Sequence, residues 1–253
     1  MSGNKAKELD TMLTRQEFAD GQTCPGELDD YKCIARGYAM IENVISVLSD
    51  MRTYTSYIYY GGFAERLGID CGQKHETVLS IWEENILGLI HPDDLPEKYL
   101  HELCFFRFIK SKPPSQCHRY CLASRLRMRD AAGNYVPVLH RLHYIQEQSR
   151  PAMRFALCLY GPVPADFSLR CAIVNTVNGR MTELHLHGNG QLLSCREAQV
   201  LTLIDKGLTS KDIAETLAIS VNTVSRHRQN ILDKLQAKSS IEACHVAKSL
   251  KII

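Results

Sequence analysis

A stretch near the carboxyl end combines hydroxyl, amide and cationic side chains on what would be one face of a helix. Ser220 is a favoured N-cap type, and the residues after it are apolar at helical spacing, at Val224, Ile231 and Leu235. With those residues inward, the exposed face carries five polar residues: Asn222, Ser225, Arg226, Gln229 and Lys234. An arginine fork can bind O6 and N7 of guanine in the major groove of DNA, and polar groups at a helix start bind phosphate well. These residue types therefore predict contacts with a nucleic acid.

Two further helix starts precede this stretch. Ser194 to Glu197 has the pattern of a capping box, and Thr209 to Asp212 repeats it. Gly207 is placed to end the first of these helices, and Ala218-Ile219 is expected to form a tight turn before Ser220. Two short helices joined by such a turn leave the amino end of the second one projecting, a shape that fits a major groove about 12 Å wide. In the alternative, a plain helical bundle, the same caps and apolar stripes would contribute stability alone.

The cysteines give a weaker indication of chemistry. The ten cysteines are irregularly spaced, at positions 24, 33, 71, 104, 117, 121, 158, 171, 195 and 244, which predicts thiols rather than a disulfide framework. Cys104, Cys117 and Cys121 invite a zinc site, but their spacing is not a standard zinc pattern, and cysteines at this spacing in a strand also share a core face. We expect no metal and no other cofactor. The sequence offers no clustered nucleophile, base and oxyanion set, so an enzyme is not expected either.

Composition places the chain among ordinary globular proteins. Hydrophobic residues make up 45% and charged residues 23% of its 253 residues, and this length suggests two domains. Residues 193–253 carry nine Lys or Arg against six Asp or Glu, an excess of +3, whereas the remainder carries −1. That basic excess mildly supports a phosphate-facing surface. No run approaches the roughly 18 apolar residues of a membrane span, and the start lacks the apolar core of a secretory signal. We therefore expect a cytoplasmic protein in a reducing compartment, with no membrane partner.

The first half of the chain reads as helices around one strand. Residues 1–29 are polar and are expected to form frayed or short helical structure. Residues 30–51 are expected to hold one amphipathic helix that runs to about Ser49, because apolar residues recur every three or four positions: Ile34, Tyr38, Ile41, Ile45 and Leu48. A β-branched and aromatic run then predicts a strand to Tyr60, ended by Gly61-Gly62. Residues 64–110 are expected to be rich in helix, with Asp93 or Asp94 capping one of them.

After Pro113-Pro114 the apolar periodicity changes from helical to alternating. Residues 120–129 and 135–146 flank a turn composition and predict an antiparallel pair, and residues 153–160 predict a third strand. A hairpin is expected over 171–186, around Asn178-Gly179. Gly188-Asn189-Gly190 is expected to be a flexible joint, and the period is helical from Leu192 to the end.

The carboxyl-terminal residues resemble a known DNA-binding family. Four segments resemble the LuxR-type helix-turn-helix domain over 192–253: Leu193-Ser-x-Arg-Glu-x-x-Val-Leu, Gly207-Leu-Thr-x-Lys-Asp-Ile-Ala, Ile219-Ser-x-x-Thr-Val-x-x-His and Asn230-Ile-x-x-Lys-Leu. The resemblance implies an all-α domain of four helices. It implies base contacts from Ser225, Arg226 and Gln229, and phosphate contacts from Thr209, Lys211, Asn222, Thr223 and Lys234.

The same resemblance implies that the final helix, 240–250, pairs two DNA-binding domains through Ile241, Ala247 and Leu250. His227 would be a buried, hydrogen-bonded packing residue. Two positions depart from the family pattern. Ser225 stands where lysine is usual, which should shift sequence preference, and Ser240 stands where arginine is frequent, with Lys238 nearby in partial compensation.

Residues 52–163 resemble a PAS domain, a sensory module of α+β fold. The resemblance rests on three segments: Tyr57-Ile-x-Tyr-Gly-Gly-Phe-Ala-Glu-Arg-Leu-Gly68, His91-Pro-Asp-Asp-Leu95 and Arg125-Leu-Arg-Met-Arg-Asp-x-x-Gly133-x-Tyr. It implies an antiparallel sheet with flanking helices that binds a small-molecule ligand or pairs with another copy. The helix of 30–51 would then either contact a second copy or cover the sheet. The hairpin and linker of 164–191 would either extend the sheet or brace the linker.

Two cofactors common in this sensory family are not expected. The chain lacks the Asn-Cys-Arg-Phe-Leu-Gln segment of flavin photosensors. His101 stands roughly where haem-binding members place an axial ligand, but a lone histidine on a helix is far more often an ordinary side chain.

Together these patterns predict a transcription regulator. Its partners would be double-stranded DNA, a second copy of the chain and a ligand in the PAS-like domain. The alternative is a protein-interaction module, an anti-activator that docks on RNA polymerase or another regulator. Salt separates the two, because binding through DNA phosphates weakens steeply as salt rises.

Overall fold

A computed structural model describes residues 2–18, 26–70, 72, 74–147, 152–165, 167–184, 193–235, 237–249 and 253. Its helices are α1 (Ser2–Thr14), α2 (Glu27–Ile41), α3 (Phe63–Arg66), α4 (Glu84–Leu87), α5 (Asp94–Lys110), α6 (Pro114–Cys117), α7 (Cys195–Asp205), α8 (Ser210–Thr216), α9 (Val221–Leu235) and α10 (Ser240–Ser249). Its strands are β1 (Ile45–Asp50), β2 (Thr55–Tyr60), β3 (His75–Val78), β4 (Tyr120–Arg129), β5 (Tyr135–Gln146), β6 (Met153–Pro162), β7 (Cys171–Asn175) and β8 (Met181–Glu183).

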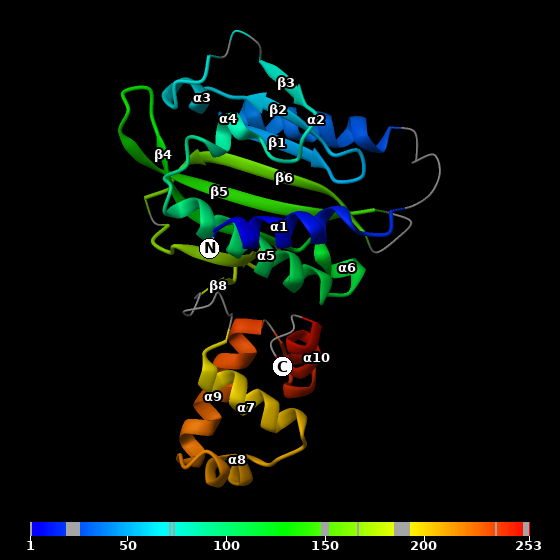
Figure 1. The fold of residues 1–253 in the computed structure, drawn as a ribbon, viewed down its shortest axis with the longest axis vertical. Helices are drawn as coiled ribbons and strands as arrows, with labels where there is room; N and C mark the ends of the chain where they lie inside the picture. The colour runs from blue at the N-terminus through cyan, green and yellow to red at the C-terminus, as the bar shows by residue number, and fades with distance from the viewer. Residues whose placement is uncertain are drawn as a thin grey trace.

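The strands form one antiparallel sheet in the order β3-β2-β1-β6-β5-β4-β7-β8. At its centre β1, which precedes the segment that resembles a PAS domain, pairs with β6, the last long strand of that segment. The sheet forms the upper body in Figure 1, with α2 on one face and α1 and α5 on the other, and α7 to α10 form the lower body. The α+β class, the β4–β5 pair and the helical carboxyl-terminal domain are confirmed.

The expected helix of residues 30–51 is wrong in its second half. Helix α2 ends at Ile41, Asn43 adopts a left-handed backbone with φ 56°, and strand β1 begins at Ile45. Ile45 and Val47 point into one apolar cluster, while Leu48 points into another on the opposite face. Because a central strand is buried on both faces, apolar residues need not alternate along it. The apolar positions of β1 therefore also fitted the three- and four-residue spacing of a helix.

The apolar residues that predicted this helix are not all buried. Ile34 is 47% exposed and Ile41 is 82% exposed, whereas the small side chains of Ala35 and Ala39 are buried. The buried cluster with Ala35 includes Leu48 and Phe155 of the sheet, so α2 covers one sheet face. This outcome agrees with the second of the two roles expected for this helix.

The amino-terminal residues form a more ordered element than expected. In helix α1, Leu9 is completely buried and Leu13 is almost completely buried, in a cluster that includes residues of α5. Asp10 accepts a hydrogen bond from Trp82 Nε1 at 2.8 Å, and Arg107 of α5 donates to Glu8. Local polarity suggested fraying, but two leucines one helical turn apart anchor the helix on α5.

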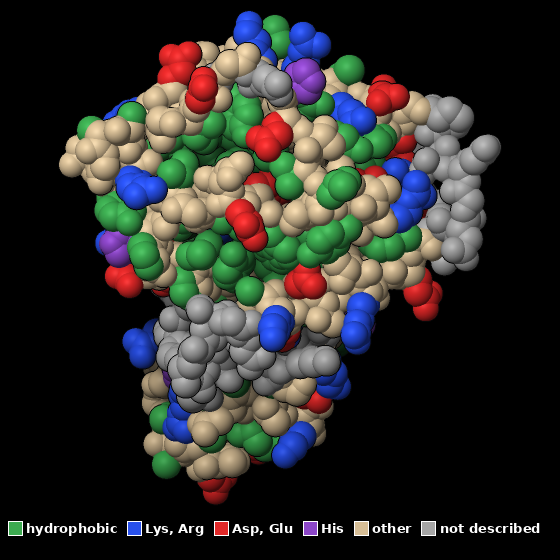
Figure 2. Space-filling view, turned by 45° about the horizontal axis from the view of Figure 1, so that its top comes forward, with side chains coloured by type: hydrophobic (Ala, Val, Ile, Leu, Met, Phe, Trp, Pro, Cys, Tyr) green, Lys and Arg blue, Asp and Glu red, His purple; other side chains and the backbone are tan. Residues whose placement is uncertain are grey.

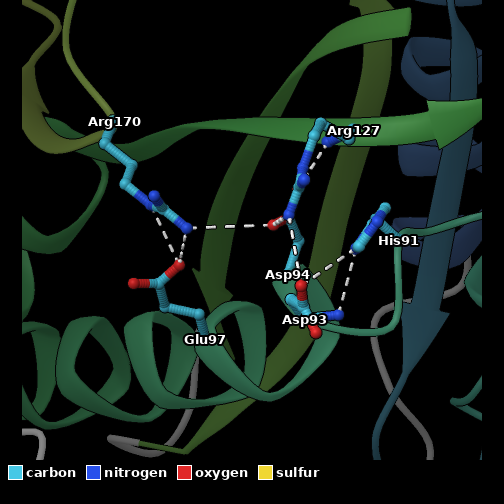
Figure 3. A network of polar contacts seen from close by, with 6 residues as sticks. All are labelled: His91, Asp93, Asp94, Glu97, Arg127 and Arg170. Carbon is cyan, nitrogen blue, oxygen red and sulfur yellow. Dashed lines mark hydrogen bonds and ion pairs between the residues drawn. The ribbon is translucent and has the colours of Figure 1, made fainter. Parts of the chain in front are cut away.

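The aspartates expected to cap α5 bind an arginine instead. Asp93 occupies the N-cap position without a side-chain cap. Asp94 accepts from Arg127 Nε at 3.0 Å, from Arg127 Nη2 at 2.6 Å and from the Arg127 backbone amide at 2.8 Å. Although burial opposes it, these bonds hold the pKa of Asp94 below its usual value. The network fastens the start of α5 to β4 and to the residue before β7, and Figure 3 draws its members: His91, Asp93, Asp94, Glu97, Arg127 and Arg170.

The predicted hairpin after the third long strand is confirmed, and it extends the sheet. Strand β7 pairs with β4, strand β8 pairs with β7, and Gly179 in the turn has φ 72°. Gly188-Asn189-Gly190 lies outside the described residues. No helix within the described ranges is long and apolar enough to cross a membrane.

We predict opposite effects for two glycines near the α2–β1 connection. A Cβ at Gly61 would lie 2.4 Å from Ala39 O and 2.6 Å from Val44 O, so Gly61→Ala should lower the free energy of unfolding by about 1–3 kcal/mol. A Cβ at Gly37, within α2, would meet nothing within 4 Å, so Gly37→Ala should raise it by about 0.5–1 kcal/mol. Urea unfolding of both variants tests this, and a Gly61→Ala chain as stable as the parent would contradict the close backbone approach.

Candidate nucleic-acid interface

The caps predicted for the carboxyl-terminal helices are confirmed. Ser194 Oγ accepts from the Glu197 amide at 3.2 Å, and Glu197 accepts from the Ser194 amide at 2.8 Å, so a capping box starts α7. Thr209 and Asp212 make the equivalent box at the start of α8. Ser220 Oγ accepts from the Thr223 amide at 3.0 Å at the start of α9. Each helix therefore begins where a local side chain satisfies its free amides.

The turn between α8 and α9 depends on one strained residue. Ala218 has φ 51°, a left-handed conformation that costs an L-residue with a Cβ about 1–2 kcal/mol. The Ile219 amide donates to Ala214 O at 2.9 Å, which closes the end of α8. This turn sets the angle at which α9 leaves α8.

Relieving that strain should stabilise the domain. Ala218→Gly is expected to raise the free energy of unfolding by about 1 kcal/mol, because glycine adopts the left-handed region without a Cβ penalty. Ala198→Gly, inside α7, is the matched control and should lower the free energy of unfolding by about 1 kcal/mol. Thermal unfolding of both chains measures the pair, and a lower midpoint for Ala218→Gly would contradict the strain.

Helix α9 buries one face and presents the other. Val224, Ile231 and Leu235 are buried, as predicted. The expected base-contact residues lie together on the exposed side: Ser225, Arg226 and Gln229. Arg226 has no hydrogen bond or ion pair with any described residue, while Ser225 Oγ donates to Val221 O and Gln229 donates to Asp233. Arg226 is therefore an exposed cation on this face that makes no ion pair or hydrogen bond with the described part of the chain.

The expected phosphate contacts divide into available and engaged groups. Lys211 and Asn222 are exposed without partners among the described residues. Thr209 and Thr223 serve the helix caps, so they stand at helix starts with their hydroxyls already bonded.

Lys234 does not lie with the other expected contacts. Its Nζ lies 2.7 Å from Glu197 Oε2, and its side chain is only 17% exposed. Burial raises the pKa of Glu197, but the hydrogen bonds from Lys234 and Ser194 outweigh it and lower that pKa overall. Lys234 therefore braces α9 against the cap of α7.

Two arginines hold the domain together in a way that the sequence reasoning missed. Arg228 donates to Ser210 Oγ at 2.8 Å and to Ser240 Oγ at 3.1 Å, which joins α9 to the starts of α8 and α10. Arg196 donates to Leu217 O at 2.5 Å, at the end of α8. The available signal was the position of Arg228, which stands on the same helical stripe as the buried Val224 and Ile231.

The expected pairing residues of α10 have unlike surroundings. Ile241 is 84% exposed, which suits a contact with a second copy. Ala247 is 0% exposed, in a buried cluster that also contains residues of the sheet domain, so it offers no surface to a partner in this structure and its expected role stays a prediction. Leu250 lies outside the described residues. His227 was expected to be buried and hydrogen-bonded. It is partly buried, but its Nδ1 has no hydrogen-bond partner among the described residues.

The helical domain contacts the sheet domain through charged pairs. Arg180, between β7 and β8, lies 2.7 Å from Asp233 of α9, and Lys112 lies 3.9 Å from Glu242 of α10. On the face that Figure 2 shows, Lys and Arg side chains are spread separately over the smaller domain rather than gathered in one patch.

Comparison with known proteins agrees with this geometry over the carboxyl-terminal part. Residues 191–247 match the family model of bacterial regulatory proteins, luxR family. The chain is 37% identical over 95 residues to the oxygen regulatory protein NreC of Staphylococcus haemolyticus, and 38% identical over 96 residues to that of Staphylococcus epidermidis. Each match covers 37% of this chain and 44% of the relative, so less than half the length of these relatives is matched.

Two solved structures align over most of the chain at low identity. The complex of phage VqmA with DPO covers 88% of this chain and 91% of its own, with 13% identity and a TM-score of 0.31. The VqmA dimer of Vibrio cholerae without target DNA covers 89% and 88%, with 11% identity and a TM-score of 0.30.

Proposed function

We propose that this chain, whose residues 191–247 form a LuxR-type helix-turn-helix domain, is a cytoplasmic transcription regulator in which a PAS-like sensory domain controls binding to double-stranded DNA. The observation that carries the proposal is the exposed face of α9. There Arg226 and Asn222 stand without partners among the described residues, on a helix whose opposite side is buried. A helix that leaves its cationic face free while it is held by three others suits insertion into a groove.

The roles of individual residues follow from where they lie. Arg226 would bind a guanine through its fork, and Ser225 and Gln229 would turn from their intrahelical bonds to neighbouring base edges. Lys211, Asn222 and the cap residues Thr209 and Thr223 would contact the flanking phosphates. Lys234 would reach a phosphate only by leaving Glu197, so we assign it a bracing role first.

The sheet domain supports the sensory half of the proposal. It is one antiparallel sheet with helices on its faces, which is the architecture that the PAS resemblance implies. Gly61 and Gly62 directly follow β2, and the His91 turn directly precedes α5. A ligand bound near α5 could act on DNA binding through β7 and β8, because Arg180 at this hairpin contacts α9.

Two copies of the chain would bind together. Two recognition helices about 34 Å apart would read a palindromic site, and joining two half-sites raises affinity through effective concentration. Exposed Ile241 on α10 is the side chain that we assign to this pairing.

Selection from a random-sequence duplex pool tests the function. The full chain should enrich a palindromic sequence, and fluorescence anisotropy on the enriched duplex should show affinity falling by about 10³-fold between 50 and 200 mM salt. Lys211→Ala should lower the salt slope by about one per half-site, whereas Lys206→Ala, at an exposed lysine at the end of α7, should leave it unchanged. Absence of salt-sensitive binding would reject the proposal and favour the anti-activator that docks on RNA polymerase.

A further inference from the structure

A buried polar cluster in the sheet domain lies apart from the DNA-binding surface. It joins Glu102 on α5, His140 on β5 and Cys158 on β6, three residues far apart in the sequence. We propose that these three side chains bind a divalent transition-metal ion of the zinc class. The site does not depend on the function proposed above, because its test measures bound metal and uses no DNA.

The ligand atoms already converge. One atom each from Glu102, His140 and Cys158 lie within 4.8 Å of one another, and His140 Nε2 lies 3.6 Å from Glu102 Oε1. Zinc bonds to nitrogen, oxygen and sulfur are about 2.0–2.3 Å long, so a small inward movement of these side chains would bring all three to bonding distance.

His140 supplies an independent indication of a ligand. Its side chain is 0% exposed, and its Nε2 has no hydrogen-bond partner among the described residues. A buried nitrogen without a partner is destabilising, and a metal bond at Nε2 would offset that cost. The other ring nitrogen, Nδ1, lies 3.2 Å from Ser124 Oγ. With Nδ1–H donating to that hydroxyl, the Nε2 lone pair points at the cluster, which is the usual support for a metal-binding histidine.

The chemistry of the set selects the kind of ion. A thiol, an imidazole and a carboxylate together suit zinc and its borderline neighbours better than magnesium or calcium. Metal binding would displace the proton of the Cys158 thiol to solvent. The thiolate and the Glu102 carboxylate then balance the two charges of the ion.

Lys98 is the competitor for this site. Its Nζ lies 2.7 Å from Glu102 Oε1, and both side chains are buried. A second buried carboxyl, Glu83, interacts with the Lys98 charge and accepts hydrogen bonds from Ser49 and Ser56. An ion that neutralises Glu102 therefore leaves Lys98 a buried partner in Glu83.

This set differs from the cysteines that the sequence suggested. Cys117 Sγ donates to backbone oxygens near its own helix, and the described residues do not bring Cys104, Cys117 and Cys121 to one metal-sized centre. His101 is also buried on α5 but lies outside the cluster. Its pKa is lowered to about 4, mainly by burial and secondly by the positive charge of Arg170.

Metal loading of the full chain tests the site. After chelator treatment, the chain is dialysed against Co²⁺ or Zn²⁺, and elemental analysis and the cobalt–thiolate absorption band are recorded. We expect one ion per chain, with the band and the ion lost in Cys158→Ser and His140→Gln. Cys171→Ser, which removes a buried cysteine outside the cluster, should keep both. No bound metal in the parent chain, or full loading of His140→Gln, would overturn the proposal.

A milder variant separates metal binding from folding. Ser124→Ala removes the support of His140 Nδ1 but no ligand, so it should keep one ion per chain and bind it about 10- to 100-fold more weakly. Zinc should also raise the unfolding temperature of the parent chain more than that of Cys158→Ser, as expected for an ion bound only by the folded state. Equal affinity in Ser124→Ala and the parent, or equal thermal shifts with and without Cys158, would count against the site.

Discussion

Replacing Arg226 with alanine is expected to weaken binding to the enriched duplex by about 1–3 kcal/mol, or roughly 5- to 150-fold. The physical reason is the loss of a two-point bond to one guanine by a side chain that has no other partner among the described residues. Because Arg226 is exposed, the free energy of unfolding should change by no more than about 0.5 kcal/mol. Fluorescence anisotropy at fixed salt measures the affinity, and thermal unfolding measures the stability.

Two further variants show whether Arg226 reads a base or merely adds charge. Arg226→Lys keeps the cation but loses the fork, so it should bind unrelated duplexes as the parent does and lose preference at one guanine. Lys206→Ala removes an exposed cation of the same domain at the end of α7 and should leave that preference intact. An Arg226→Ala chain that binds its selected duplex as tightly as the parent would rule out base reading by this residue.

Replacing Arg154 with methionine is expected to lower the free energy of unfolding by about 3–5 kcal/mol. Arg154 is 2% exposed and donates to Glu27 Oε2 at 2.9 Å and to Asp50 Oδ2 at 3.2 Å, both of them buried. Its guanidinium also lies 4.4 Å from the centre of the Phe155 ring. Methionine preserves much of the volume but leaves two buried carboxylates without a cation, so α2 should loosen from β1 and β6.

The matched control is a partly exposed arginine on the neighbouring strand. Arg141 pairs with Glu42, but both side chains are more than a quarter exposed, so Arg141→Met should cost no more than about 1 kcal/mol. Adding Glu27→Gln and Asp50→Asn to Arg154→Met should recover part of the loss, because neutral amides remove the unpaired charges. Urea unfolding of the four chains gives the comparison. Equal losses at Arg154 and Arg141 would show that burial of the charges is not the cause.

The sequence was sufficient wherever the deciding interactions lie within one turn of helix or across one hairpin. The capping boxes at Ser194 and Thr209 and the turn at Gly179 each join residues a few positions apart. The carboxyl-terminal domain is built from such signals, so its helices and the exposed face of α9 were predictable. The exception there was Lys234, whose partner comes from another helix.

Only the tertiary structure decided the elements and sites whose partners are distant in the chain. Residues 45–50 satisfy both a helical and an alternating pattern, and pairing with β2 and β6 makes them a strand. Asp94 could cap α5 locally, but Arg127 offers a charged fork from across the sheet. Glu102, His140 and Cys158 have no spacing that marks a metal site, because three separate elements bring them together. Local spacing therefore determined the carboxyl-terminal helical domain, while the sheet domain, whose contacts cross the sheet, required the folded chain.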